Sequence, residues 1–149
     1  MQDISGYGLV ARVMASVTFP NGFEITQYAD DTDPLDIPEI VVADKKMGLN
    51  GDLIVWVVAT PIEIAVAVVP GSDDDVNLAI LLEANRTAKG KPPVRDIITF
   101  TGIYPQSANL TLSPGRILSG PPGSSVAAVG RLKSKVYKFT FENRTGSPA

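Results

Sequence analysis

The chain of 149 residues fits one domain that is long enough to bury a hydrophobic core, and its 44% apolar and 19% charged residues are typical of a globular protein. It has no cysteine and no histidine, which excludes disulfides, thiolate metal sites, histidine-dependent catalytic triads and most zinc sites. The net charge of −3 conceals an asymmetry, since residues 1–75 carry 13 acids and 3 bases whereas residues 76–149 carry 3 acids and 10 bases. Either the two halves pair within one fold, or an acidic patch on one copy meets a basic patch on the next.

The N-terminal residues 1–8 are small and polar, without the basic and long apolar segments of a secretory signal. We expect them to form an arm that is free or held by a partner. The longest apolar runs, near residues 53–59 and 64–69, are too short to span a membrane. These features favour a protein that is made in the cytoplasm and has no membrane span.

Residues 9–19 alternate in a way that predicts a strand, and residues 23–29 predict its partner. Asn21 and Gly22 lie between them, and this dipeptide is a strong signal for a type I′ turn. The sequence therefore predicts a β-hairpin that turns at Asn21-Gly22.

An acidic segment follows, in which residues 30–44 contain six acids and no base. Pro34 and Pro38 disfavour a helix, so we expect an extended inter-strand loop over about residues 29–51, with a short strand at 40–43 and a tight turn at Asn50-Gly51. The acid spacing does not match a calcium-binding EF-hand loop. A solvated loop, or one that meets a basic neighbour, explains it better.

Two stretches rich in valine and isoleucine, residues 53–58 and 62–69, predict central strands on either side of Thr60-Pro61. Trp56 lies in the first of them. Its expected role is core packing or anchoring at an interface.

The one clear helix is predicted over residues 72–87. Ser72 is the expected N-cap, and the three aspartates after it suit the positive end of a helix dipole. Apolar residues then point around most of the helix. Either the helix is sunk in the core of its own domain, or one flank packs on its own sheet and the other on a neighbouring subunit.

The C-terminal half predicts further strands at residues 97–104, 108–118 and 132–142, with a break at Pro114-Gly115 and a frayed end over residues 143–149. The whole chain, residues 1–149, thus predicts a single domain that is mainly β with one helix, of the α+β class. No serine or threonine has a histidine to activate it, and helix capping accounts for the paired carboxylates Asp73 and Asp75. We expect no catalytic, cofactor or metal site and no sequence-specific binding of nucleic acid.

The order of these features, with the runs FPNGFEITQYADDTDPLDIP, NGDLIVWVVATP and PGSDDDVNLAILLEANR and the closing strands, resembles the small tail tube proteins of long-tailed bacteriophages over about residues 5–142. The resemblance implies an antiparallel β-sandwich or barrel-like domain flanked by one helix. It implies a structural virion protein, not an enzyme, that is assembled in the host cytoplasm. Its hexameric rings would stack into the tail tube through which double-stranded DNA is ejected. Partners would be further copies, tape measure, baseplate and terminator proteins, and a sheath if the tail is contractile.

Two alternatives stay open, namely another ring-forming tail component, such as a tube initiator, terminator or secretion-tube homologue, and a monomeric β-barrel that binds a small ligand. By the resemblance, the acidic loop and the helix contact neighbouring subunits or rings, through Asp30, Asp31, Asp33, Asp36, Glu39, Lys45, Lys46, Leu78, Leu81 and Leu82. The polar face of the first hairpin is expected to line the lumen, through Arg12, Ser16, Thr18, Glu24 and Thr26. Arg12 would need Glu24 or a neighbour's acid as a partner there.

Overall fold

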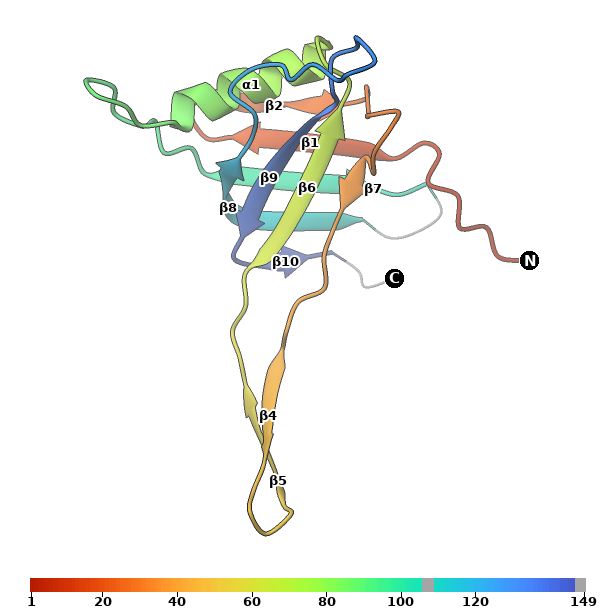
Figure 1. Ribbon diagram of the computed structural model, residues 1–149, viewed down its shortest axis with the longest axis vertical. Helices are drawn as coiled ribbons and strands as arrows, with labels where there is room; N and C mark the ends of the chain where they lie inside the picture. The colour runs from red at the N-terminus through yellow and green to blue at the C-terminus, as the bar shows by residue number, and fades with distance from the viewer. Residues whose placement is uncertain (106–108, 147–149) are drawn as a thin grey trace.

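The computed structural model describes residues 1–105 and 109–146, and it has the predicted mainly antiparallel β architecture with one helix in that part of the chain (Figure 1). Ala108, at the start of one predicted strand, and residues 147–149 of the predicted frayed end lie outside the described residues. The elements in chain order are β1 (Val10–Ala15), β2 (Phe19–Ile25), β3 (Leu35–Asp36), β4 (Ala43–Met47), β5 (Leu53–Val57), β6 (Ile62–Val68), α1 (Asp73–Asn85), β7 (Ile98–Ile103), β8 (Leu110–Ser119), β9 (Lys135–Phe141) and β10 (Arg144–Thr145). Arg144 and Thr145, predicted to fray, instead pair with β8.

An eight-stranded sheet in the order β2-β1-β7-β8-β9-β6-β3, with β10 also paired to β8, folds over on itself into two layers. Figure 1 shows β9 and β6 crossing over β1, β2 and β7. β8 belongs to both layers, because its first half pairs with β7 and its second half, from Gly115 on, pairs with β9. The predicted break at Pro114-Gly115 is thus the corner of one continuous strand.

Gly115 is required at this corner. A Cβ atom there would lie 2.2 Å from Cδ1 of Phe141 and 2.4 Å from the carbonyl oxygen of Thr140. No real Cβ contact is so short, so any other residue would push the two layers apart.

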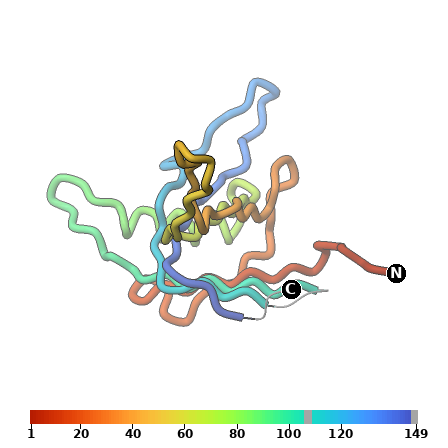
Figure 2. The backbone as a smooth tube through the Cα atoms, turned by 90° about the horizontal axis from the view of Figure 1, so that it is seen from below, coloured from red at the N-terminus to blue at the C-terminus, as the bar shows by residue number. Residues whose placement is uncertain are grey.

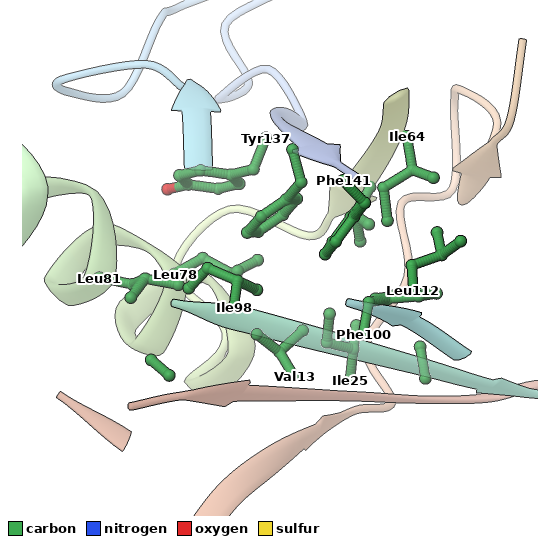
Figure 3. Packing of buried hydrophobic residues seen from close by; sticks show 14 of the residues in the cluster. Val13, Ile25, Ile64, Leu78, Leu81, Ile98, Phe100, Leu112, Tyr137 and Phe141 are labelled. Carbon is green, nitrogen blue, oxygen red and sulfur yellow. The ribbon is translucent and has the colours of Figure 1, made fainter. Parts of the chain in front are cut away.

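The core fills the space between the layers with large side chains from both (Figure 3). Tyr137, Phe139 and Phe141 come from β9, and Phe100 from β7 faces them. Leu78 and Leu81 of α1 close one end of the sandwich. Burial of these apolar surfaces is the main favourable term in folding.

The predicted turn at Asn21-Gly22 is wrong. Ala15 pairs with Phe19 and Val13 with Phe23, so the chain reverses over residues 16–18, and Asn21-Gly22 forms a bulge within β2. Gly22 has a φ of 73°, and a Cβ on it would meet the Met14 side chain at 2.7 Å. The dipeptide thus supplies the positive φ that a bulge needs instead of a turn.

Asp96, just before β7, explains why the chain turns at residues 16–18. Its buried carboxylate accepts hydrogen bonds from the backbone N–H groups of Val17 at 2.8 Å and Thr18 at 2.9 Å, and from the Thr18 hydroxyl. Asn85 at the end of α1 donates to the same carboxylate at 2.9 Å. One side chain therefore fixes the turn and ties the C-terminal end of the helix to it.

The helix begins as predicted. Ser72 is the N-cap, and its hydroxyl accepts a hydrogen bond from the Asp75 N–H. At the other end, the Lys91 ammonium donates to the carbonyl groups of Glu83 and Arg86, which satisfies acceptors that the helix itself leaves open.

Two further buried aspartates fasten the start of the helix. Asp74 accepts hydrogen bonds from the N–H groups of Thr26 at 2.8 Å and Gln27 at 2.7 Å, just after β2. Asp75 accepts from the Tyr137 hydroxyl at 2.9 Å and lies 3.2 Å from the Lys135 ammonium, both on β9. Burial, reinforced by the Asp75 carboxylate, raises the pKa of Tyr137. The helix is therefore attached to both layers.

Asp96→Asn tests the turn anchor. Burial alone would raise the pKa of Asp96, but the hydrogen bonds that it accepts outweigh burial and hold the pKa below its ordinary value of 3.8. Its contribution to stability is therefore complete above that ordinary value and is lost as the pH falls through the lower folded value. We expect Asp96→Asn to lower the free energy of unfolding by about 2 kcal/mol at pH 7 and to reduce the loss of stability below about pH 4.

Urea denaturation at pH 7 and pH 3 measures both effects. Asp33→Asn, at an exposed carboxylate, is the matched control. An Asp96→Asn variant with wild-type stability and the same acid dependence would contradict the anchor.

Candidate assembly surfaces

A hairpin of β4 and β5 projects from the sandwich as an arm, which we define as residues 41–60 (Figure 1). Figure 2 looks at the same arm end-on, from below. Among residues 1–105 and 109–146, its strands pair only with each other, from Ala43 opposite Val57 to Met47 opposite Leu53. The predicted turn at Asn50-Gly51 is present, with Gly51 at a φ of 87°. The segment predicted as an extended loop, residues 29–51, contains β3 and the first strand of this arm, and the short strand predicted at residues 40–43 lies at Ala43–Met47 instead.

The expectation that residues 53–58 form a central strand is also wrong. Every residue of β5 is exposed, including Trp56 at 46% and Val57 at 89%. The register places Leu53, Val55 and Val57 on one face of the arm and Ile54 and Trp56 on the other. The arm therefore exposes apolar side chains on both faces, and no other strand in the described part of the chain pairs with it.

Lys45 and Lys46, predicted contact residues, lie exposed on β4 opposite Val55 and Ile54. Each face of the arm therefore carries one lysine beside its apolar side chains.

The predicted acidic contacts divide into two groups. Asp30 forms a two-pronged ion pair with Arg131 at 3.1 and 3.2 Å, and Asp31 accepts a hydrogen bond from Ser134. The Arg131 hydrogen bonds lower the pKa of Asp30. These two exposed acids thus have partners within the chain, whereas Asp33, Asp36 and Glu39 form no ion pair among the described residues.

The helix contacts need correction. Leu78 and Leu81 are 0% exposed and lie in the chain's own core, and Leu82 packs against it. A neighbouring subunit cannot reach the first two. The apolar side chains that α1 presents outward are Val76 and Ile80, which are about half exposed.

The predicted lumen residues lie on or beside the outer face of the β2-β1-β7-β8 layer. Arg12 stands opposite Glu24 with 3.9 Å between their charged atoms, so the structure supplies the partner that Arg12 needs. Ser16 and Thr18 lie at the turn, where the Ser16 hydroxyl accepts from the Ile97 N–H and the Thr18 hydroxyl donates to Asp96. Thr26 lies exposed just past β2.

This outer face also contains threonines that the sequence predictions missed. Thr101 stands beside Arg12, Thr111 beside Thr101, and Thr145 beside Thr111, which makes a polar row across the layer. The alternation of Ile98, Thr99, Phe100 and Thr101 was the available signal. Ile98 and Phe100 are buried, so the threonines between them face outward. This row is polar and, apart from the paired Arg12 and Glu24, uncharged, while Met14 and Ile103 add part-exposed apolar side chains to the same face.

The structure gives no sign of a metal centre or membrane helix in the part that it describes. No group of three or more acidic residues is placed there to hold a metal ion. Within residues 1–105 and 109–146, no helix is both long and apolar enough to cross a membrane.

The chain matches, over residues 2–145, the family described as tail fiber protein gp32. The chain belongs to this family. A sequence comparison with curated proteins gave no match.

Solved structures with the same fold come from tail-like particles. A chain of the anti-feeding prophage baseplate, in a six-fold symmetrised structure, has a TM-score of 0.58 at 11% identity, over 99% of this chain and 97% of that one. A chain of the anti-feeding prophage tube-terminating cap has a TM-score of 0.55 at 10% identity, over 100% and 93%. A chain of the PVC sheath/tube terminator, from an extracellular contractile injection system, has a TM-score of 0.53 at 13% identity, over 99% of each. At these identities the likeness shows the shared fold.

Leu78→Ala and Ile80→Ala together test the corrected view of the helix. Leu78→Ala leaves a cavity in the core, and we expect it to lower the free energy of unfolding by about 3 kcal/mol. Ile80→Ala removes a half-exposed side chain and should change that free energy by less than about 0.5 kcal/mol. Urea denaturation of the free chain measures both. A Leu78→Ala variant that is as stable as wild type would contradict the core position of Leu78 and favour the original prediction that it contacts a neighbouring subunit.

Proposed function

We propose that this chain is a structural, non-enzymatic subunit of a phage tail that assembles with copies of itself into hexameric rings around the axis of the tail tube. The observation that carries the proposal is the arm, because its apolar side chains stand outside the core of the chain. The family description and the tail particles that contain the same fold support a place in the virion tail. Assembly in the host cytoplasm is part of the same proposal. The six-fold symmetry of one of these particles supports the ring number.

The arm requires cover from other subunits. An isolated two-stranded hairpin is at best marginally stable in water, and exposed apolar side chains on both faces add to its instability. Trp56, Ile54 and Val55 together span both faces. Neighbouring copies that pack on these faces would bury them and stabilise the arm.

The polar outer face of the β2-β1-β7-β8 layer suits the lining of a channel for DNA. A conduit must not hold phosphates tightly, because each lysine or arginine that neutralises a phosphate strengthens binding. A row of threonines crosses this face, and its Arg12 is paired with Glu24. Such a surface lets double-stranded DNA pass without sequence-specific contacts.

A ring at the end of the tube is the second candidate, and the source of the similar structures favours it. All three come from a baseplate, a cap or a terminator. In either role, the partners are further copies and other tail proteins. Against a monomeric ligand-binding barrel, the interior is filled by Phe100, Tyr137, Phe139 and other core side chains (Figure 3).

Electron microscopy of the purified chain at high concentration tests the proposal. Long tubes support the tube subunit, and separate closed rings support the end-of-tube role. A chain that stays monomeric at every concentration contradicts both.

Trp56 provides a second test, because it is the only tryptophan in the sequence. On assembly we expect its fluorescence to shift to shorter wavelength and to become less accessible to acrylamide, since a neighbour covers it. Ile54→Asp and Val55→Asp, one on each face of the arm, should block assembly and leave the free energy of unfolding within about 0.5 kcal/mol of wild type.

Val129→Asp is the matched control, because Val129 is 85% exposed on a different loop. Assembly of both arm variants at wild-type concentrations would show that the arm is not a subunit contact. If an arm variant unfolds the sandwich, the arm side chains stabilise the fold of their own chain instead of a contact between subunits.

A further inference from the structure

The layer formed by the second half of β8 with β9, β6 and β3 carries opposite charges at its two edges. On its outer face, Arg116 of β8 stands opposite Thr140 of β9, and Thr140 stands opposite Glu63 of β6. In the next row, Lys138 stands opposite Ala65, and Ala65 opposite Asp36 of β3. The β8 edge is therefore basic and the β3 edge acidic, and Figure 1 shows these edges on opposite sides of the layer.

At the basic edge, two arginines line one hollow. Arg95 and Arg116 border it, together with Asn85, Thr87, Pro93 and Ile117. Among residues 1–105 and 109–146, neither arginine takes part in an ion pair, although Arg12, Arg86 and Arg131 each have a carboxylate partner. We call this feature the arginine hollow.

The backbone at Arg95 is held in an unusual conformation. Its φ of 63° is rare for a residue other than glycine. The bonds on either side fix it, since the Val94 N–H donates to the Ala84 carbonyl at 3.0 Å and the Asp96 N–H to the Asn85 side chain at 2.8 Å. Backbone strain of this kind is concentrated at functional sites, and here it places an arginine where glycine would be easier.

At the acidic edge, carboxylates gather at the base of the arm. Glu39 and Glu63 line a second hollow with Pro38, Ile40, Thr60 and Pro61. Asp36 lies on the adjoining strand. We call Asp36, Glu39 and Glu63 the acidic edge, and none of the three is in an ion pair within the described part of the chain.

We propose that the acidic edge of one copy docks on the arginine hollow of the next copy. Carboxylates and guanidinium groups form the strongest charge-assisted hydrogen bonds available to side chains, often two at a time. Because the two surfaces lie on opposite sides of the layer, the contact joins unlike patches, and contacts of that type close into rings or extend as filaments. The inference rests on the proposed ring and names the surfaces that meet around it.

A charge-swap experiment tests the pairing. We expect E39K/E63K and R95E/R116E each to raise the concentration needed for half-assembly at least ~30-fold, because like charges would face each other. The chain that carries all four substitutions should assemble like wild type. A 1:1 mixture of the two double variants should also assemble, since each Lys edge meets a Glu hollow and each native edge meets a native hollow. Sedimentation velocity measures all of these.

Two controls separate this contact from net charge and from folding. K89E/K133E reverses two exposed lysines outside the arginine hollow, with the same change in net charge as R95E/R116E, and should assemble normally. Arg95→Gly removes one arginine and relieves the positive φ, so the folded chain should be at least as stable as wild type while assembly weakens.

Three outcomes would overturn the inference. If R95E/R116E assembles at wild-type concentrations, the proposed docking contact is wrong, but the proposed ring-forming function is not contradicted. Failure of both the four-substitution chain and the 1:1 mixture, with both of them folded, would show that the two surfaces do not meet. A wild-type chain that never assembles would overturn the proposed function, and this inference with it.

Discussion

Three buried carboxylates hold the helix against both layers of the sandwich. The helix has two fully buried apolar side chains, Leu78 and Leu81, which is a small hydrophobic contact for 13 residues. Asp74 and Asp75 at its start and Asp96 near its end attach it further, because their carboxylates accept hydrogen bonds that join the helix to other elements. Taking a carboxylate out of water costs several kcal/mol, and the hydrogen-bond donors around each of these side chains offset that cost. The helix therefore has one position, and that position fixes the loop that carries Arg95.

Local chemistry made the helix predictable and left the first hairpin unpredictable. Ser72 and the aspartates after it are a capping pattern that needs no knowledge of the rest of the chain. Asn21-Gly22 is an equally good turn signal, yet the chain turns earlier, because Asp96 accepts from the N–H groups of Val17 and Thr18. That acceptor lies 78 residues further along the chain from Thr18 and belongs to no local pattern. The same limit applies to Asp75, whose capping role was evident while its bond to Tyr137 was not.

The sequence indicates that certain apolar and charged residues need partners. It does not indicate whether those partners lie in the same chain or in another one. A run of valine and isoleucine indicates that both faces of a strand must be buried, but it does not say which chain buries them. In the structure, β6 is covered by its own sandwich, whereas β5, with a similar composition, lies outside it. The acidic residues divide in the same way, because Asp30 pairs with Arg131 of its own chain, whereas Asp36 and Glu39 form no ion pair within the part of the chain that the structure describes. Composition indicates that the apolar strands need burial and that the acids need basic partners. Only the three-dimensional arrangement shows which residues meet these needs within their own chain.

The acidic edge and the arm adjoin, since Glu39 and Ile40 lead directly into residue 41, and the two surfaces suit different stages of the proposed assembly. Complementary charges act over distances of about 10 Å at moderate salt and mainly speed and orient the encounter of two proteins. Apolar contacts act at short range and mainly determine how slowly the complex separates. An acidic edge that meets an arginine hollow would therefore align two copies before the arm packs. Only then would burial of Trp56 and its neighbours stabilise a hairpin that is marginal by itself. In the free chain, the apolar contact surface would consequently lie on the arm, which is marginally stable by itself. The arm would become fully ordered only as each subunit joins the ring.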